Sequence, residues 1–201
     1  MKMHPKVSRE FYRNPDVVAV AQQLLGKFLC TQLEDGYAVG MITETEAYCG
    51  ATDKACHAYP NKRTKRTEVM FGDGGFAYVY LCYGIHQLFN IVTNRAGQAD
   101  AILIRGIEPV AGIELIEQRR KMKVTRAQVS SGPGTVTKAL GINKQHYGLD
   151  LLGDEIWLED RGVHFPQEEL LIGPRVGIDY AEEDALLPWR FRVKGNKYIG
   201  K

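Results

Sequence analysis

Two pairs of strand-like segments, each joined by a very short turn, place the strongest constraint on the fold of this chain. The pairs are residues 27–33 with 37–48 and residues 76–82 with 88–93. The first pair is separated by the turn-forming Glu34-Asp35-Gly36, and the second is interrupted at Tyr83-Gly84. Strands joined by so few residues pair antiparallel. The chain is therefore expected to contain two β-hairpins.

Helical segments lie before and after these hairpins. A helix is expected from Asn14-Pro15, a favourable cap followed by proline at the first helical position, to Gly26. A strand over residues 101–107, a helix that opens at Pro109 and a short helix that ends at Gly141 follow. Residues 50–73 are mainly loop, and short strands are expected over residues 150–158, 175–178 and 190–194. These patterns predict one α+β domain over residues 1–201, with a mainly antiparallel curved sheet surrounded by helices.

The composition removes several classes of protein. With 44% hydrophobic and 25% charged residues, the chain resembles ordinary globular proteins and not disordered or fibrous ones. No apolar segment follows Met1 and no window approaches the length of a membrane span, so a soluble, cytoplasmic protein without membrane contact is expected. The four cysteines form no CxxC pair, which favours a reducing compartment.

The net charge of +2 is too small to indicate nucleic-acid binding by itself. The distribution of the charge is more informative, because one five-residue segment contains four cations. These are Lys62, Arg63, Lys65 and Arg66. Such a cluster is either a solvated surface or a contact to a DNA backbone, and the sequence leaves both interpretations open.

The strand expected over residues 37–48 places Glu44, Glu46 and Tyr48 on one face, because side chains alternate along a strand. An exposed surface strand would explain the two carboxylates simply. Carboxylates two positions apart on a strand lie roughly 7 Å apart, a separation that suits an inverting glycosidase. A metal site that includes His57 is a weaker alternative, because no second histidine or cysteine follows at a ligand spacing. We therefore expect no metal and no cofactor.

Tyrosines are concentrated in the second expected hairpin, at positions 78, 80 and 83. Aromatic residues often serve only to pack a sheet. The break at Tyr83-Gly84 instead projects the Tyr83 ring outward at the hairpin tip. An exposed aromatic ring at such a tip can act as a wedge between stacked bases.

Taken together, these segments resemble the alkyladenine (3-methylpurine) DNA glycosylase family in order and spacing. The resemblance extends from about Phe11 to Val193. The matching pieces are Glu44-Thr45-Glu46-Ala47-Tyr48, His57, Met70-Phe71, Tyr78-Val79-Tyr80-Leu81-Cys82-Tyr83-Gly84, Asn90, Leu103-Ile104-Arg105-Gly106-Ile107-Glu108-Pro109, Ser131-Gly132-Pro133, Ala139-Leu140-Gly141-Ile142 and Arg175-Val176-Gly177-Ile178. No single piece is specific, but their combination in register is.

The resemblance implies a catalytic group of three residues. Glu46 matches the general base that deprotonates the attacking water. Arg105 matches the residue that helps to hold this water and a nearby phosphate, and the backbone carbonyl of Val176 matches the third partner of the water. Glu44 is then expected to be structural.

The resemblance also implies residues that bind the damaged base and the DNA. Tyr48, His57 and Tyr80 match the walls that sandwich a flipped base. Asn90 matches the side chain that excludes an undamaged guanine, and Tyr83 matches the wedge that fills the gap in the duplex. The loop before Met70-Phe71 departs from the family, which often has Arg-Asn there, so the phosphate contacts of Lys62, Arg63, Lys65 and Arg66 do not follow from the resemblance.

The function implied is that of a monofunctional DNA glycosylase. It would remove alkylated or deaminated purines such as 3-methyladenine, 7-methylguanine, hypoxanthine and ethenoadenine from double-stranded DNA, acting as a monomer. No lysine falls in the matched pocket, so base removal without strand cleavage is expected. Two alternatives stay open: a module that binds damaged DNA without catalysis, and a sugar hydrolase that uses Glu44 and Glu46. A carboxylate repels phosphate, which counts against the first alternative. The second requires Glu44 as an acid with a raised pKa.

Overall fold

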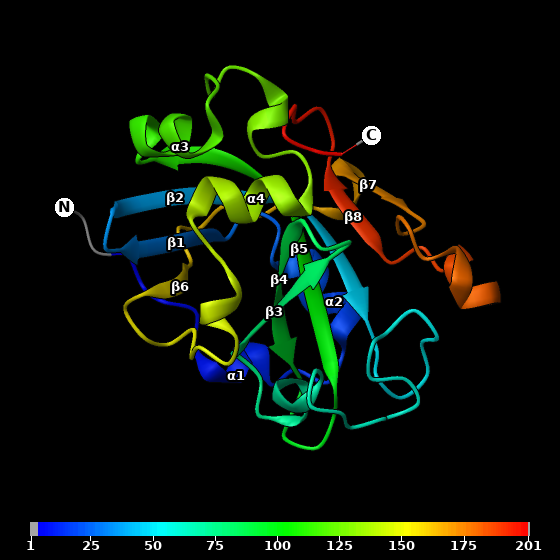
Figure 1. Cartoon of the computed structure of the whole chain (residues 1–201). Coiled ribbons are helices and arrows are strands. Elements are labelled where there is room, and N and C mark those ends of the chain that lie inside the picture. Colours follow the sequence, from blue (N-terminus) through cyan, green and yellow to red (C-terminus); the bar gives the residue numbers. More distant parts are fainter. Residues whose placement is uncertain (1–3, 201) are drawn as a thin grey trace.

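The computed structural model of the chain describes residues 4–200. One antiparallel sheet forms the centre of the fold, with the strand order β3-β4-β5-β2-β1-β6 (Figure 1). The strand β8 pairs with β2 and with β7. The strands are β1 (Phe28–Leu33), β2 (Gly36–Tyr48), β3 (Ala77–Cys82), β4 (His86–Thr93), β5 (Asp100–Ala111), β6 (Ile156–Glu159), β7 (Leu170–Gly173) and β8 (Arg190–Val193). All the strand pairings among the described residues are antiparallel, so the predicted α+β class is confirmed.

Helices and short 3-10 turns connect and cover the strands. The helices are α1 (Arg9–Tyr12), α2 (Val17–Gln23), α3 (Ile113–Arg120) and α4 (Pro133–Leu140). The 3-10 turns are η1 (Glu68–Phe71), η2 (Ala127–Val129), η3 (Lys144–His146), η4 (Gln167–Glu169) and η5 (Asp179–Leu186). None of the described helices is long and apolar enough to cross a membrane.

Both predicted hairpins are present. β1 pairs with β2 up to the register Leu33↔Gly36. β3 pairs with β4 up to Cys82↔His86, so three residues form the second hairpin tip. Tyr83 in this tip has a positive φ of 49° and is 87% exposed. The sequence break at this position therefore projects the ring outward, as predicted.

β2 is the longest strand and changes its partner along its length. One edge of β2 pairs with β5, and the other edge pairs first with β1 and then, near Glu46, with β8. The register against β5 shifts on both sides of Glu44. The second half of β2 is therefore buried between β5 and β8.

Two of the expected helix starts were wrong. The first long helix begins at Val17, because the carboxylate of Asp16 accepts a hydrogen bond from the Ala19 amide at 2.9 Å and caps it. Pro109 lies within β5 and not at a helix start. Proline has no backbone N–H to donate to a neighbouring strand. Pro109 is tolerated in β5 because the register against β2 shifts next to its partner, Gly40. α3 begins after Gly112, which has a positive φ of 68°.

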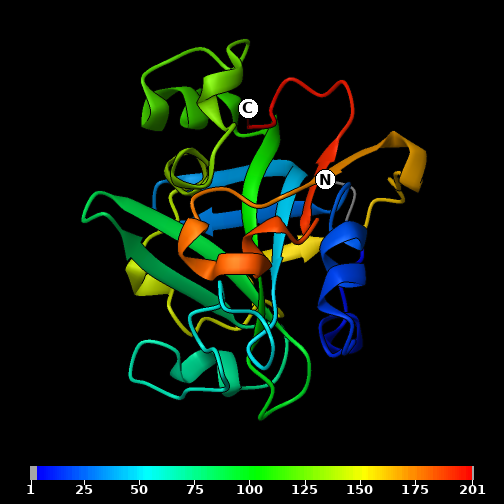
Figure 2. The same ribbon diagram turned by 90° about the vertical axis from the view of Figure 1, so that its right-hand side faces the viewer.

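The C-terminal part departs further from the sequence-based prediction. Residues 175–178 form no strand, and the strand nearby is β7 at residues 170–173. Residues 174–186 instead cross in front of the sheet, close to the loop after β2 (Figure 2). The expected strand over residues 150–158 is confined to β6, and the preceding residues form turns. The last expected strand is present as β8.

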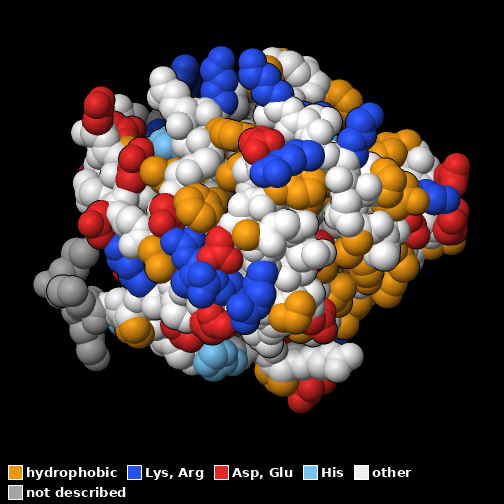
Figure 3. All heavy atoms as spheres, turned by 90° about the horizontal axis from the view of Figure 1, so that it is seen from below, with side chains coloured by type: hydrophobic (Ala, Val, Ile, Leu, Met, Phe, Trp, Pro, Cys, Tyr) orange, Lys and Arg blue, Asp and Glu red, His pale blue; other side chains and the backbone are white. Residues whose placement is uncertain are grey.

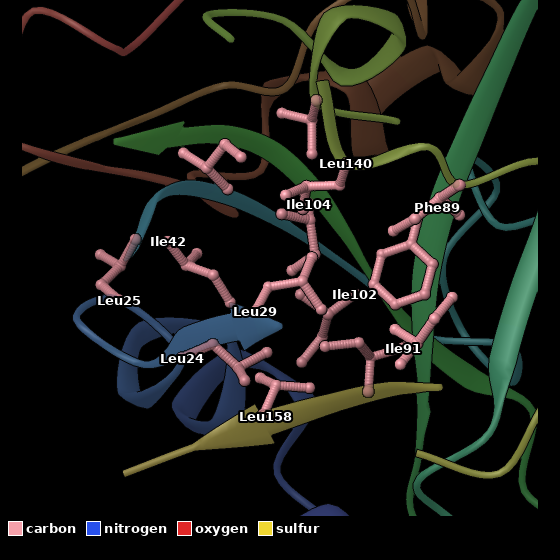
Figure 4. Close-up of a cluster of buried hydrophobic side chains, with 14 of the residues drawn as sticks. Leu24, Leu25, Leu29, Ile42, Phe89, Ile91, Ile102, Ile104, Leu140 and Leu158 are labelled. Carbon is pink, nitrogen blue, oxygen red and sulfur yellow. The ribbon is translucent and has the colours of Figure 1, made fainter. Parts of the chain in front are cut away.

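The hydrophobic core lies between the sheet and the helices α2 and α4 (Figure 4). Leu24 and Leu25 from the segment after α2 face Leu29 of β1 and Ile42 of β2, and all four are buried. The other labelled members come from β4, β5, α4 and β6: Phe89, Ile91, Ile102, Ile104, Leu140 and Leu158. This core supports the half of the sheet that carries Glu46.

Candidate active site

A cavity of about 640 Å³ opens between the end of β2, the hairpin β3-β4, the loop after β2 and the segment around Val176. Most of the residues predicted for the site line this cavity: Tyr48, His57, Tyr80, Asn90, Arg105 and Val176, with Arg66 and Tyr83 also on its surface. Glu46 lies behind this lining. Its side chain is fully buried, and the three groups nearest its carboxylate belong to residues of the cavity wall.

Those three groups hold the Glu46 carboxylate in one orientation. The hydroxyl of Tyr48 donates a hydrogen bond to Oε2 at 2.7 Å, and the amide of Val176 donates to Oε1 at 2.9 Å. Nε of Arg105 lies 3.4 Å from Oε1. A carboxylate accepts about four hydrogen bonds, so Glu46 can accept at least one more in addition to these contacts. The contact seen for Val176 is through its amide, and the role of its carbonyl stays a prediction.

Burial raises the pKa of Glu46 above its ordinary value. The positive charge of Arg105 and the hydrogen bonds from Tyr48 and Val176 oppose that effect, while the charge of Glu44 adds to it. Glu46 is therefore a stronger proton acceptor than an exposed glutamate. A raised pKa inside a cavity wall is a common property of acid–base groups in active sites.

Glu44 has a different environment, although it lies only two residues away. Its Oε1 accepts hydrogen bonds from Nε of Arg105 at 2.9 Å and from Nε of Arg190 at 2.8 Å, and its Oε2 accepts from the Gly200 amide. Burial alone would raise the pKa of Glu44, but Arg105, the Gly200 amide and Arg190 together lower it. Glu44 is thus an ionised structural group, which contradicts the acid role that a sugar hydrolase would require of it.

A buried ion pair between Arg175 and Asp53 lies next to the part of the cavity wall formed by Tyr48 and Val176. Arg175 and Asp53 form a bidentate pair, and both side chains are fully buried. The guanidinium of Arg175 also donates to the carbonyl of Ala47 at 2.8 Å and lies 4.7 Å from the centre of the Tyr48 ring. This pair fixes the ring of Tyr48 and the chain next to Val176.

Arg175 lies in one of the segments that resemble the family, but the sequence alone indicates neither its role nor its pairing with Asp53. No local signal identifies such a pair, because its members are 122 positions apart in the chain.

Two of the predicted base-binding residues, His57 and Tyr80, form an aromatic corner with Tyr78. The ring centres of His57 and Tyr80 are 4.7 Å apart, and those of Tyr78 and Tyr80 are 5.4 Å apart. Nδ1 of His57 lies 2.8 Å from the hydroxyl of Tyr78. Burial, with a smaller effect of Arg66, lowers the pKa of His57 to about 4, so the imidazole is neutral at physiological pH.

Tyr78 also lines the cavity, although it is not among the site residues predicted from the sequence. Its two-residue spacing from Tyr80 places both rings on one face of β3, and this was the signal that could have identified it.

Asn90 lies on β4 directly opposite Tyr78 and is 4% exposed. Its Nδ2 donates to the carbonyl of Tyr78 at 3.1 Å, which fixes the orientation of the amide in the cavity wall. At the rim, Tyr83 and Ile85 are 87% and 74% exposed. The tip thus places two uncovered apolar side chains beside the cavity.

The four predicted backbone-contact cations differ in their surroundings. Arg63 pairs with Glu68 at 2.9 Å, and its guanidinium lies over the ring of Phe71. Arg66 is exposed, and it lines the cavity wall beside His57 and Tyr80. Lys62 and Lys65 are exposed, and neither forms an ion pair within residues 4–200.

On another face of the molecule, cations and carboxylates lie next to one another. Figure 3 shows the side of the molecule on which α1 lies, where Lys and Arg side chains stand next to Asp and Glu side chains. At α1 and the residue after it, Arg9 pairs with Asp150 and Arg13 pairs with Asp73, each at 2.6 Å. This face is therefore not an uninterrupted basic surface.

Comparison with known proteins identifies the family of the chain. The family model of methylpurine-DNA glycosylase (MPG) matches residues 10–197. A protein of Alkaliphilus oremlandii is 44% identical over 98% of this chain and 99% of its own length. A protein of Bacillus cereus is 44% identical over 95% of this chain and 97% of its own length. Both relatives carry the provisional name 3-methyladenine DNA glycosylase. The chain described here belongs to the methylpurine-DNA glycosylase family.

Proposed function

We propose that this protein is a monofunctional DNA glycosylase that turns a damaged purine out of double-stranded DNA and hydrolyses its N-glycosidic bond. The observation that carries the proposal is the Glu46 carboxylate, buried behind an aromatic cavity with a raised pKa and held by Tyr48 and Val176. The names of the relatives support a DNA glycosylase. The lesions proposed are 3-methyladenine, 7-methylguanine, hypoxanthine and ethenoadenine.

Base flipping is proposed from the size of the cavity and the shape of its rim. A purine can reach a side chain as deep as Glu46 only after it has left the base stack. Tyr83, exposed at the hairpin tip, would occupy the space that the purine leaves in the duplex. The partner is therefore double-stranded DNA, and one domain acting as a monomer suffices for the contact.

The chemistry follows from the position of Glu46. A water held between Glu46, Arg105 and Val176 would attack C1′ of the flipped nucleotide on the face opposite the base. The C1′–N bond breaks, its electron pair leaves with the purine, and the water proton passes to Glu46. The products are the free base and an abasic site. No lysine lines the described cavity, so we propose no Schiff base and no strand cleavage.

Selectivity for alkylated purines would arise at the aromatic side chains of the cavity wall. A purine alkylated at N3 or N7 carries a positive charge, and a cation over a tyrosine ring is attracted to it. Tyr48 and Tyr80 supply such rings in the cavity wall. Asn90, with its amide orientation fixed by the Tyr78 carbonyl, would exclude an undamaged guanine.

Base release from defined duplexes tests the proposal. One duplex contains a single 1,N6-ethenoadenine, a second contains hypoxanthine, and a third substrate is methylated DNA; alkali then cleaves any abasic sites. We expect release by the wild type and its loss in Glu46→Gln, with DNA binding retained. If the wild type bound these duplexes but released no base, the protein would be a damage-binding module.

A further inference from the structure

The guanidinium of Arg66 lies at the wall of the cavity. It lies 4.9 Å from the centre of the Tyr80 ring, and its Nη2 is 3.3 Å from Nε2 of His57. No carboxylate pairs with it among residues 4–200, in contrast to Arg63 in the same loop, which pairs with Glu68. A cation thus covers the ring on which a purine is proposed to stack.

The backbone of this loop is fixed, so only the Arg66 side chain has to move. The Tyr147 hydroxyl donates to the carbonyl of Arg66 at 3.3 Å and accepts from the Val69 amide at 3.1 Å. The buried Thr67 hydroxyl donates to the carbonyl of Lys62 at 3.1 Å. The guanidinium therefore extends from an anchored turn and can rotate between the cavity and the solvent.

Arg66 also determines the hydrogen-bonding state of His57. A guanidinium only donates, so Nε2 of His57 accepts from it, and the proton of the neutral imidazole is on Nδ1. Nδ1 then donates to the hydroxyl of Tyr78, 2.8 Å away. As long as Arg66 stays in place, the acceptor of His57 that faces the cavity is already used.

We propose that Arg66 is a specificity-determining residue that excludes free purines from the cavity and admits a purine only as part of DNA. A free base must displace the guanidinium from Tyr80 and His57 without compensation. A nucleotide in DNA brings phosphates, and the charge-assisted, bidentate contact of arginine with phosphate is stronger than its contact with a ring. The inference rests on the proposed function, because it assumes that the cavity receives a purine.

The test compares two ligands and two variants. Free 3-methyladenine is titrated by NMR, and a duplex with one ethenoadenine is titrated by fluorescence anisotropy. For Arg66→Ala we expect free-base binding about 3- to 10-fold tighter, and duplex binding weaker, with a salt slope reduced by about one. Arg63→Ala, which removes the same charge from the same loop, should leave free-base binding unchanged.

The opposite signs of the two effects are decisive. Free-base binding that stays the same or weakens in Arg66→Ala would show that the guanidinium does not compete for the ring. Duplex binding as tight as in the wild type would overturn the role of phosphate. The free-base titration involves no bond cleavage, so it is independent of whether the wild type releases bases from DNA. If the wild type released no base from DNA, the proposed function would be wrong. The free-base titration would still show whether Arg66→Ala strengthens or weakens binding of the free purine.

Discussion

Glu44 and Glu46 lie two residues apart on the same strand, contact the same Arg105 and are both fully buried, yet they have opposite properties. Glu44 is surrounded by Arg105, Arg190 and the Gly200 amide, and its pKa is lowered. Glu46 lies 3.4 Å from the guanidinium of Arg105, and burial raises its pKa. The comparison shows that the partners of a buried carboxylate, and not its position on a strand, decide whether it is a structural anion or a candidate base.

The largest expected difference between the two glutamates is in the rate of base release. Glu46→Gln should lower the single-turnover rate by about 10²- to 10⁴-fold, the usual contribution of a general base. Glu44→Gln should retain most of the wild-type rate when folded protein is compared. The measurement is single-turnover release of ethenoadenine. If the two variants lost the same amount of activity, the alternative of a sugar hydrolase that uses both Glu44 and Glu46 would be favoured again.

The order should be reversed for stability. Glu44→Gln leaves Arg105 and Arg190 without their shared carboxylate, and breaking such a buried pair costs about 3 kcal/mol in the free energy of unfolding. Glu46→Gln should cost less, because neutralising a carboxylate of raised pKa removes a desolvation penalty. Urea denaturation at pH 7 checks this order. A larger loss for Glu46→Gln would mean that Arg105 is bound mainly by Glu46.

The pH dependence of base release should reflect the raised pKa of Glu46. The base has to be ionised, so kcat/KM should fall as the pH drops through a value above that of an ordinary glutamate. In Arg105→Gln the residual activity should fall at still higher pH, because the positive charge that favours the carboxylate is gone. A pH–rate profile for both proteins gives the two values. An acid limb that moves to lower pH in Arg105→Gln would contradict the assignment of Glu46 as the base.

The smallest expected effect concerns the loop that brings Val176 to Glu46. Glu182 in η5 has φ 55° and ψ −126°, a backbone conformation that strongly favours glycine. Glu182→Gly should raise the free energy of unfolding by about 1 kcal/mol, although the surface ion pair with Lys54 is lost. Thermal unfolding measures the change, with Glu183→Gly as the control that loses a Lys54 pair without relieving strain. A destabilised Glu182→Gly would show that the ion pair outweighs the strain.

Local features of the fold were accessible from the sequence. The two hairpins, the exposed Tyr83 and the contact between Glu46 and Tyr48 all depend on residues close together in the chain. Turn length and the two-residue period of a strand are sufficient to predict them. The expected strand at residues 175–178 was wrong for a related reason: its alternation suggests a strand, but the Val176 amide is used by Glu46 and not by a neighbouring strand.

The sequence by itself determined the antiparallel hairpins and the family. It also determined that Glu46 and Tyr48, two positions apart on β2, lie on the same face of the strand. The tertiary structure alone decided that Glu44 is held by Arg190 and the Gly200 amide, and that Arg66 covers Tyr80. The physical reason is that a pKa and an ion pair depend on burial and on charges brought together by the whole fold. Arg190 is 146 positions away from Glu44, and no local pattern encodes a contact at that separation.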